Sequence, residues 1–117
     1  MSAGYSNIYL NQGETFITQL SLTDSSGSPY DLNSFHIASS AKRSYTSANV
    51  TIKFDVNVTD SNTGTIQLTA NAATTANVTA GNLVYDVLIK DMVSNNITRV
   101  LEGIVYVSPG VTSISSL

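Results

Sequence analysis

The chain has 117 residues and a mass of 12.4 kDa, a length that fits one domain with a modest core. Hydrophobic residues make up 42% of it, which is too much apolar material for a disordered chain. The net charge is -3, and five basic residues are too few for the positive stripe that phosphate neutralisation requires. We therefore expect a folded protein with no nucleic-acid partner.

The sequence contains no cysteine, so it offers neither a disulfide framework nor a thiolate site. Residues 1–5 lack the basic and apolar regions of a secretion signal. No apolar run approaches the roughly 18 residues that a membrane-spanning helix needs. We expect a protein that is made in the cytoplasm, has no membrane partner and leaves the cell only as part of a particle.

Alternation of apolar and polar residues is the main pattern of the chain and predicts strands. Looser alternation predicts strands at residues 5–10, 16–23, 33–40, 66–68, 83–90 and 97–107. The clearest case is residues 50–59, where a one-residue slip in pairing would expose every apolar side chain, so the register is well defined. The apolar residues that share one face of this strand are Val50, Ile52, Phe54, Val56 and Val58.

Polar turns separate these strands, at residues 24–29, 60–64 and 94–96. Residues 69–79 have some helical character, but their Thr and Asn content limits a helix near 70–79 to one or two turns. The pattern predicts an all-β fold, an immunoglobulin-like antiparallel β-sandwich of about seven strands with at most one short helix. We expect a single domain over residues 1–109 and a C-terminal tail over 110–117.

Tyr85 favours the immunoglobulin-like form of the sandwich. It follows a glycine turn near the start of a late strand, as in a tyrosine corner, where the hydroxyl bonds to upstream backbone. A tyrosine that only packs in the core explains the same pattern equally well. Neither interpretation implies catalysis.

The last two predicted strands carry apolar residues on both faces, whereas an antiparallel strand with one wet face should alternate. One face therefore needs a second cover, either the chain's own loops and termini or a partner chain. A basic pair at 42–43 forms a weaker second patch, for which a solvated loop is the other interpretation. The interface candidates are Ile97, Val100, Ile104, Tyr106, Lys42 and Arg43.

The residue sets of common catalytic and metal sites are missing from the sequence. The only histidine, His36, lies between two apolar residues of a predicted strand, and a zinc site needs three or four ligands. Glu14 and Glu102 are distant in sequence and lack the aromatic neighbours of a sugar-hydrolysing pair. Residues 60–64 resemble the start of a calcium loop, but an Asx turn explains them better. We expect no enzymatic activity, no cofactor and no metal.

Six short segments that span nearly the whole chain carry a resemblance to a known class of proteins. They are SAG at 2–4, QGETF at 12–16, KRSY at 42–45, LVYDV at 83–87, TRVLEG at 98–103 and VSPGVT at 107–112. These segments resemble short virion structural proteins of tailed phages, notably contractile-tailed phages of marine bacteria. The chain is also similar to the N-terminal β-sandwich of upper baseplate proteins of lactococcal phages, a domain that docks onto the tail.

The resemblance implies a non-enzymatic component of the virion, in the baseplate, the tail or the capsid decoration. Its partners would be other virion proteins and further copies of the same chain, in a homo-oligomer or multi-copy assembly. A second interpretation is a carbohydrate-binding or adhesin-like module, since β-sandwiches carry many functions. Such a module needs exposed aromatic residues, and Tyr5, Tyr30 and Tyr45 are the free candidates.

Overall fold

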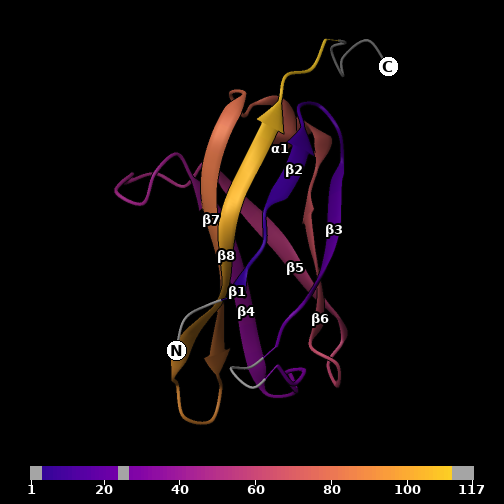
Figure 1. Ribbon diagram of the computed structural model, residues 1–117, viewed down its shortest axis with the longest axis vertical. Helices are drawn as coiled ribbons and strands as arrows, with labels where there is room; N and C mark the ends of the chain where they lie inside the picture. Colours follow the sequence, from indigo (N-terminus) through magenta and orange to yellow (C-terminus); the bar gives the residue numbers. More distant parts are fainter. Residues whose placement is uncertain (1–3, 24–26, 112–117) are drawn as a thin grey trace.

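The computed structural model describes residues 4–23 and 27–111, which form eight strands and one short helix (Figure 1). The all-β class and the short helix within residues 70–79 are confirmed. The elements are β1 Gly4–Tyr5, β2 Ile8–Asn11, β3 Phe16–Ser21, β4 Phe35–Lys42, β5 Ile52–Asp60, β6 Thr65–Ala70, α1 Ala72–Ala76, β7 Gly81–Asp91 and β8 Ile97–Ser108.

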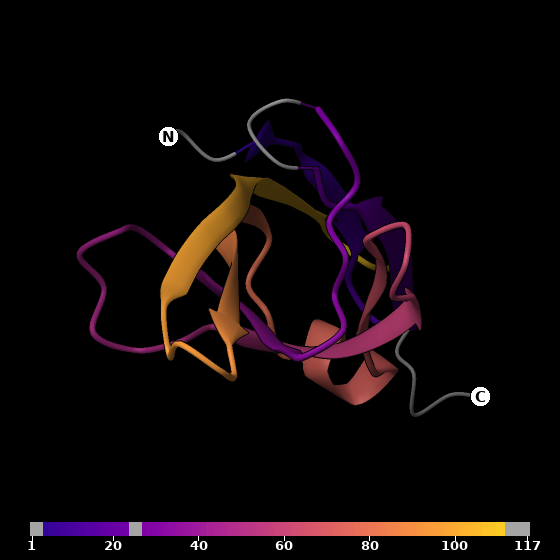
Figure 2. The ribbon, with the colours of Figure 1, turned by 90° about the horizontal axis from the view of Figure 1, so that it is seen from below.

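The strands form two layers that share one strand, β5. Residues 52–54 of β5 pair with β4, in the layer that also contains β7 and β8, and residues 55–60 pair with β6, in the layer that contains β3. The sheet therefore curls around a single core, which Figure 2 shows from the end. Because β5 passes from one layer to the other, β3 lies at one end of the strand order and β1 and β2 lie at the other.

The sheet is mixed, which corrects the prediction of a purely antiparallel sandwich. β1 and β2 both pair in parallel with β8, and they share one register, with Gly4 opposite Leu101 and Ile8 opposite Val105. Parallel and antiparallel ladders both place successive side chains on opposite faces. The alternation in the sequence therefore contains no information on the direction of the partner strand.

The N-terminal segment approaches β8 most closely at Ser6. The Ser6 N–H donates to Glu102 O over 2.9 Å, and Ser6 O accepts the hydroxyl of Tyr85 over 2.5 Å. A side chain at Gly103 would place its Cβ 2.0 Å from Ser6 O, so this approach requires glycine. Tyr85 is only 2% exposed, so it packs in the core and also bonds to backbone 79 positions upstream.

The core lies between the two layers, and the strand at 50–59 contributes less of it than its pattern predicts. Ile52 and Phe54 are 1% and 3% exposed, whereas Val50 and Val58 are 50% and 43% exposed. Val50 precedes β5, and Val58 lies next to a register shift near the end of the strand. The largest fully buried apolar side chains are Leu10, Leu22, Ile52, Ile66, Leu68, Leu83, Ile89, Val87 and Val105.

Helix α1 lies at one end of the sandwich and is tied to the turn between β2 and β3 (Figure 1). Asn71 Oδ1 caps it by accepting the Thr74 N–H over 2.8 Å. The buried Thr75 hydroxyl donates to Glu14 O over 2.8 Å. Among the described residues, no helix is long and apolar enough to span a membrane.

The predicted C-terminal tail falls mostly outside the described residues, which end at 111. β8 ends at Ser108, and the Gly110 N–H donates to Gln12 Oε1 over 2.9 Å. The end of β8 is therefore held at the turn that follows β2.

Substitution of Gly103 by Ala should lower the free energy of unfolding by about 3 kcal/mol, because the added methyl group overlaps Ser6 O. Urea unfolding measures the loss. Gly4→Ala is the matched control in the same strand pair, because its added Cβ meets nothing closer than Leu101 Cδ1 at 3.4 Å. Equal stability of the two variants would contradict the close approach.

Burial raises the pKa of the Tyr85 hydroxyl to about 12 from its ordinary value of 10.0. Above pH 10 the unfolded chain loses this proton while the folded chain keeps it, so folding stability should fall as pH rises from 10 to 12. Between these two pH values, Tyr85 should lower the free energy of unfolding by up to about 1.4 kcal/mol per pH unit. Tyr85→Phe should remove this contribution and should cost about 1 kcal/mol at pH 7 through the lost hydrogen bond. Identical pH profiles of the two proteins in urea unfolding would refute the assignment.

Candidate interaction surface

The side of β4, β7 and β8 that points away from the core carries apolar and aromatic side chains, and we call it the outer face. Strand register places Lys42, Val84 and Ile104 in one row across it, and places Leu88 beside Arg99. Leu88 is 36% exposed, while Val84 and Ile104 are half-buried. The residues that define the outer face are Lys42, Val84, Leu88, Ile97, Ile104 and Tyr106.

The loop between β4 and β5 stands away from the sheet (Figures 1 and 2). It borders a hollow on the outer face. The hollow has a volume of about 320 Å³, and Tyr45 and Val50 of the loop line it together with Val84 and Leu88 of β7. Tyr45 and Val50 are themselves 67% and 50% exposed. Apolar side chains on both sides of an open hollow are typical of a contact site.

Three charged side chains at the centre of the outer face pair with one another. Arg99 Nε lies 3.2 Å from Asp86 Oδ2, and Arg99 Nη1 lies 3.5 Å from Glu102 Oε2. All three side chains are partly exposed, so these ion pairs contribute little to stability. Arg99 offsets one of the two carboxylate charges at the centre of the face, and the apolar and aromatic side chains lie around this group.

A stacked pair of tyrosines forms the border of the outer face on the side of β2. The rings of Tyr9 and Tyr106 are 5.2 Å apart with an interplanar angle of 19°, and Tyr9 is 74% exposed. The parallel pairing of β2 with β8 places these two residues opposite each other. Sequence reasoning missed Tyr9 because no local pattern indicates that the first strand pairs with the last.

Four of the six predicted interface residues lie on the outer face. Ile97 is 64% exposed at the start of β8, and Ile104 and Tyr106 follow it along the strand, half-buried. Lys42 lines the hollow. Arg43 lies just beyond, where its guanidinium donates to Thr79 O and so holds the start of the loop.

Val100 corrects the sequence interpretation, because it is buried at 6% exposure. Val87 pairs with Leu101 and Leu88 pairs with Arg99, so Val100 is an extra residue in β8. Such a bulge moves the following residues to the other face. Val100 and Leu101 therefore both point into the core, and strict alternation along 97–107 assigned Val100 to the wrong side.

Among the described residues, every buried side-chain nitrogen and oxygen has a hydrogen-bond partner. His36 lies on an exposed position of β4, and none of the described residues forms a cluster of three His, Asp or Glu side chains. A hydrogen bond from the Val93 N–H lowers the pKa of Asp91, which caps the hairpin between β7 and β8. In residues 60–64, Asp60 Oδ1 accepts the Asn62 N–H over 3.1 Å, the bond of an Asx turn.

Comparison with known proteins finds similarity at the level of fold. The chain is similar to the N-terminal domain of phage TP901-1 ORF48, with a TM-score of 0.62 and 10% identity over 92% of this chain and 99% of that one. It also matches a family 123 glycoside hydrolase from Clostridium perfringens at a TM-score of 0.42 and 10% identity, over 95% of this chain and 24% of that enzyme. The second likeness is too weak to carry an argument. No family model and no curated protein matches the chain.

The bulge predicts a large loss of stability for substitution at Val100 and a small change for substitution at Ile97. Val100→Ser should lower the free energy of unfolding by about 2 kcal/mol, because it removes buried apolar surface and buries a hydroxyl. Ile97→Ser should change it by less than about 0.5 kcal/mol, because Ile97 is exposed. Thermal and urea unfolding measure both. An unchanged free energy of unfolding in Val100→Ser would indicate that the side chain of residue 100 lies on the outer face.

Proposed function

We propose that this chain is a non-enzymatic structural protein of a phage particle and that its outer face docks onto neighbouring virion proteins. The observation that carries the proposal is the group of exposed apolar and aromatic side chains on the outer face and at its borders, in the loop between β4 and β5 and on β2. It includes Ile97, Leu88, Tyr45, Val50 and Tyr9, whose exposed fractions run from 36% to 74%. Isolated apolar residues are common on surfaces, but a group of them beside an open hollow is a feature of interaction sites.

Two further observations support a place in a virion. The fold is similar to that of a phage protein domain over almost the full length of both chains. Three of the segments that resemble phage structural proteins, at 42–45, 83–87 and 98–103, contribute to the outer face or its hollow. The docking site in the particle is then the baseplate, the tail or the capsid surface, and neighbouring copies of this chain are among the partners.

The carbohydrate-binding alternative rests on the stacked pair of Tyr9 and Tyr106. An exposed tyrosine ring provides a flat apolar platform, and Asn7 and Asn82 lie beside this pair in the register of β2, β7 and β8. The side-chain oxygen of Asn7 already accepts the Ile104 N–H, over 3.2 Å. Binding on a glycan array that Tyr9→Ala abolishes would favour this function over docking.

The location is tested with an antibody raised against the purified chain, applied to gradient-purified particles of the phage that encodes it. Electron microscopy should show label at one location on each particle, repeated according to the local symmetry. Absence of the chain from purified particles, by labelling and by mass spectrometry, would refute the proposal.

The outer face is tested by light scattering over a concentration series of the purified chain. We expect a defined oligomer that Leu88→Glu converts to a monomer, because the variant buries a further charge among the side chains that line the hollow. Val58→Glu is the matched control, since Val58 is 43% exposed in the other layer. Loss of the oligomer in the control alone would move the contact away from the outer face.

A further inference from the structure

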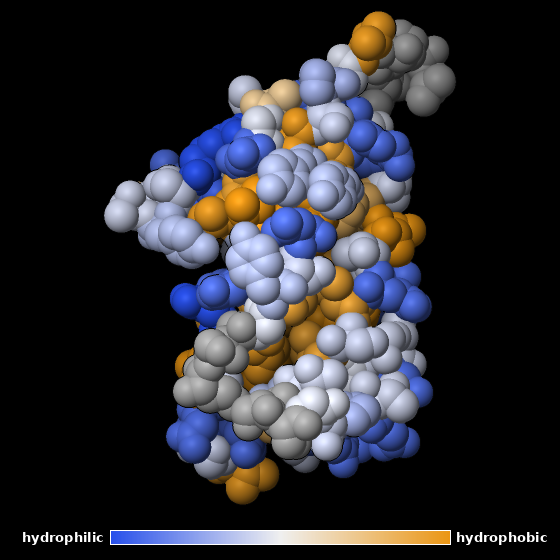
Figure 3. Space-filling model, in the orientation of Figure 1, coloured by the Kyte–Doolittle hydropathy of each residue, from blue (hydrophilic) through white to orange (hydrophobic). Residues whose placement is uncertain are grey.

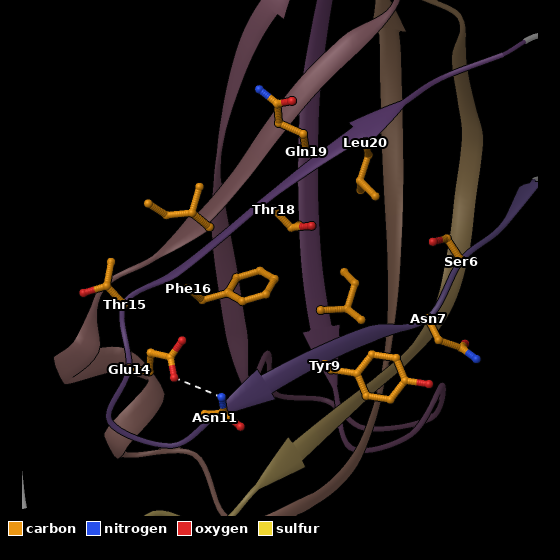
Figure 4. A pocket seen from close by; sticks show the side chains of 12 residues that line it. Ser6, Asn7, Tyr9, Asn11, Glu14, Thr15, Phe16, Thr18, Gln19 and Leu20 are labelled. Carbon is orange, nitrogen blue, oxygen red and sulfur yellow. Dashed lines mark hydrogen bonds between the residues drawn. The ribbon is translucent and has the colours of Figure 1, made fainter.

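β2 and β3 follow each other in the chain but do not pair. β2 uses one edge to pair with β8, and β3 uses one edge to pair with β6. Among the described residues, the only backbone hydrogen bond between the two strand regions is Glu14 N–H to Asn11 O, 3.2 Å, in the turn that joins them. Each strand therefore has a second edge that pairs with no described strand, and the two strands lie on either side of a gap (Figures 1 and 4).

The gap between the two edges is a cleft of about 480 Å³. Phe16 and Ile8 lie along it and are 8% and 4% exposed, and the partly buried Leu20 follows on β3. Figure 4 shows Phe16, Thr18 and Leu20 directed to the same side of β3, toward the gap. In the space-filling view, a hollow in the lower half of the face has an apolar floor (Figure 3). The cleft therefore joins two strand edges to an opening in the core.

β3 lacks the features that normally keep an open edge from pairing, and β2 has only one of them, its short length of four residues. Exposed edges in natural proteins usually carry lysine, proline or a bulge. β3 has the sequence FITQLS, with no charge and no proline, and pairs with β6 in an unbroken register. The one charged residue that lines the cleft is Glu14, whose Oε2 accepts Asn11 Nδ2–H over 2.9 Å at the closed end.

The chemistry of the cleft indicates its ligand. Free peptide N–H and C=O groups along an extended edge are satisfied by another extended backbone, with alternate side chains entering the groove. One residue of extended strand takes up roughly 160 Å³ of a sheet, from its rise, the strand spacing and the layer thickness. The cleft therefore has room for a few residues of strand, and its apolar floor favours apolar side chains at alternate positions.

We propose that the cleft between β2 and β3 accepts an extended strand of a partner protein, which pairs with both edges and closes the curled sheet. β2 runs parallel to β8, and the successive antiparallel pairings make β3 antiparallel to β2. The inserted strand therefore runs parallel to one edge and antiparallel to the other. This inference rests on the strand edges and is independent of the outer face and of the proposed function.

A second copy of the chain fits the cleft less well than a separate strand does. All described strands of a copy are already paired on at least one side, so a copy offers an edge of a sheet rather than a free strand. Pairing of edge with edge occupies β2 or β3 but not both, and it leaves Phe16 and Leu20 uncovered. A free extended segment satisfies both edges and covers the floor.

The test is a selection of displayed random 12-residue peptides on the purified chain and on two variants. Thr18→Lys places a lysine side chain in the cleft, and Ser21→Lys places the same charge at the end of the same strand, at an exposed position that does not line the cleft. We expect the chain to enrich peptides with apolar residues at alternate positions. Their synthetic forms should bind Ser21→Lys as they bind the unmodified chain and should bind Thr18→Lys at least tenfold more weakly.

The contribution of backbone hydrogen bonds to peptide binding is tested on the unmodified chain. This test does not depend on whether Thr18→Lys folds. Methylation of alternate peptide nitrogens of a selected peptide removes donors along one edge of its backbone and should weaken binding at least tenfold. Amide exchange should slow in β2 and β3 on binding. The proposal is overturned if no peptide is enriched, if methylation leaves the affinity unchanged, or if Ile97→Glu on the outer face abolishes binding while Thr18→Lys does not.

Discussion

The contact between Ser6 and Gly103 determines where the first strand lies, and both candidate surfaces depend on it. Ser6 O accepts the hydroxyl of the buried Tyr85, and the missing side chain at Gly103 lets the backbones meet. This contact holds β1 and β2 parallel to β8 in a single register. As a result, Tyr9 stacks on Tyr106 at the border of the outer face, and the free edge of β2 faces β3.

The two surfaces differ in the chemistry that they offer to a partner. The outer face presents side chains, with the charges of Arg99, Asp86 and Glu102 paired among themselves. The cleft presents peptide groups of two strand edges above an apolar floor. A component that connects neighbours in a particle needs more than one contact surface, and these two lie on separate parts of the sheet. Shape and hydrogen bonding, rather than net charge, would decide the partners of both.

Much of the secondary structure followed from local pattern, whereas the face on which each interface candidate of β8 lies depends on the bulge in that strand. Alternation located the strands because side chains of a strand alternate between two environments, and the Thr-rich and Asn-rich segment held one short helix as predicted. Ile97, Ile104, Tyr106 and Lys42 lie on the outer face. Val100 does not, because the bulge in β8 adds one residue and reverses the alternation beyond it.

The sequence by itself determined the all-β class, the strand positions and the apolar character of the last hairpin, because each depends on neighbours within a few residues. Only the tertiary structure decided the parallel pairing of the first strand with the last, the passage of β5 between layers and the open cleft between β2 and β3. These depend on contacts between residues far apart in the chain. A period of two is the same whichever strand, direction or layer supplies the partner.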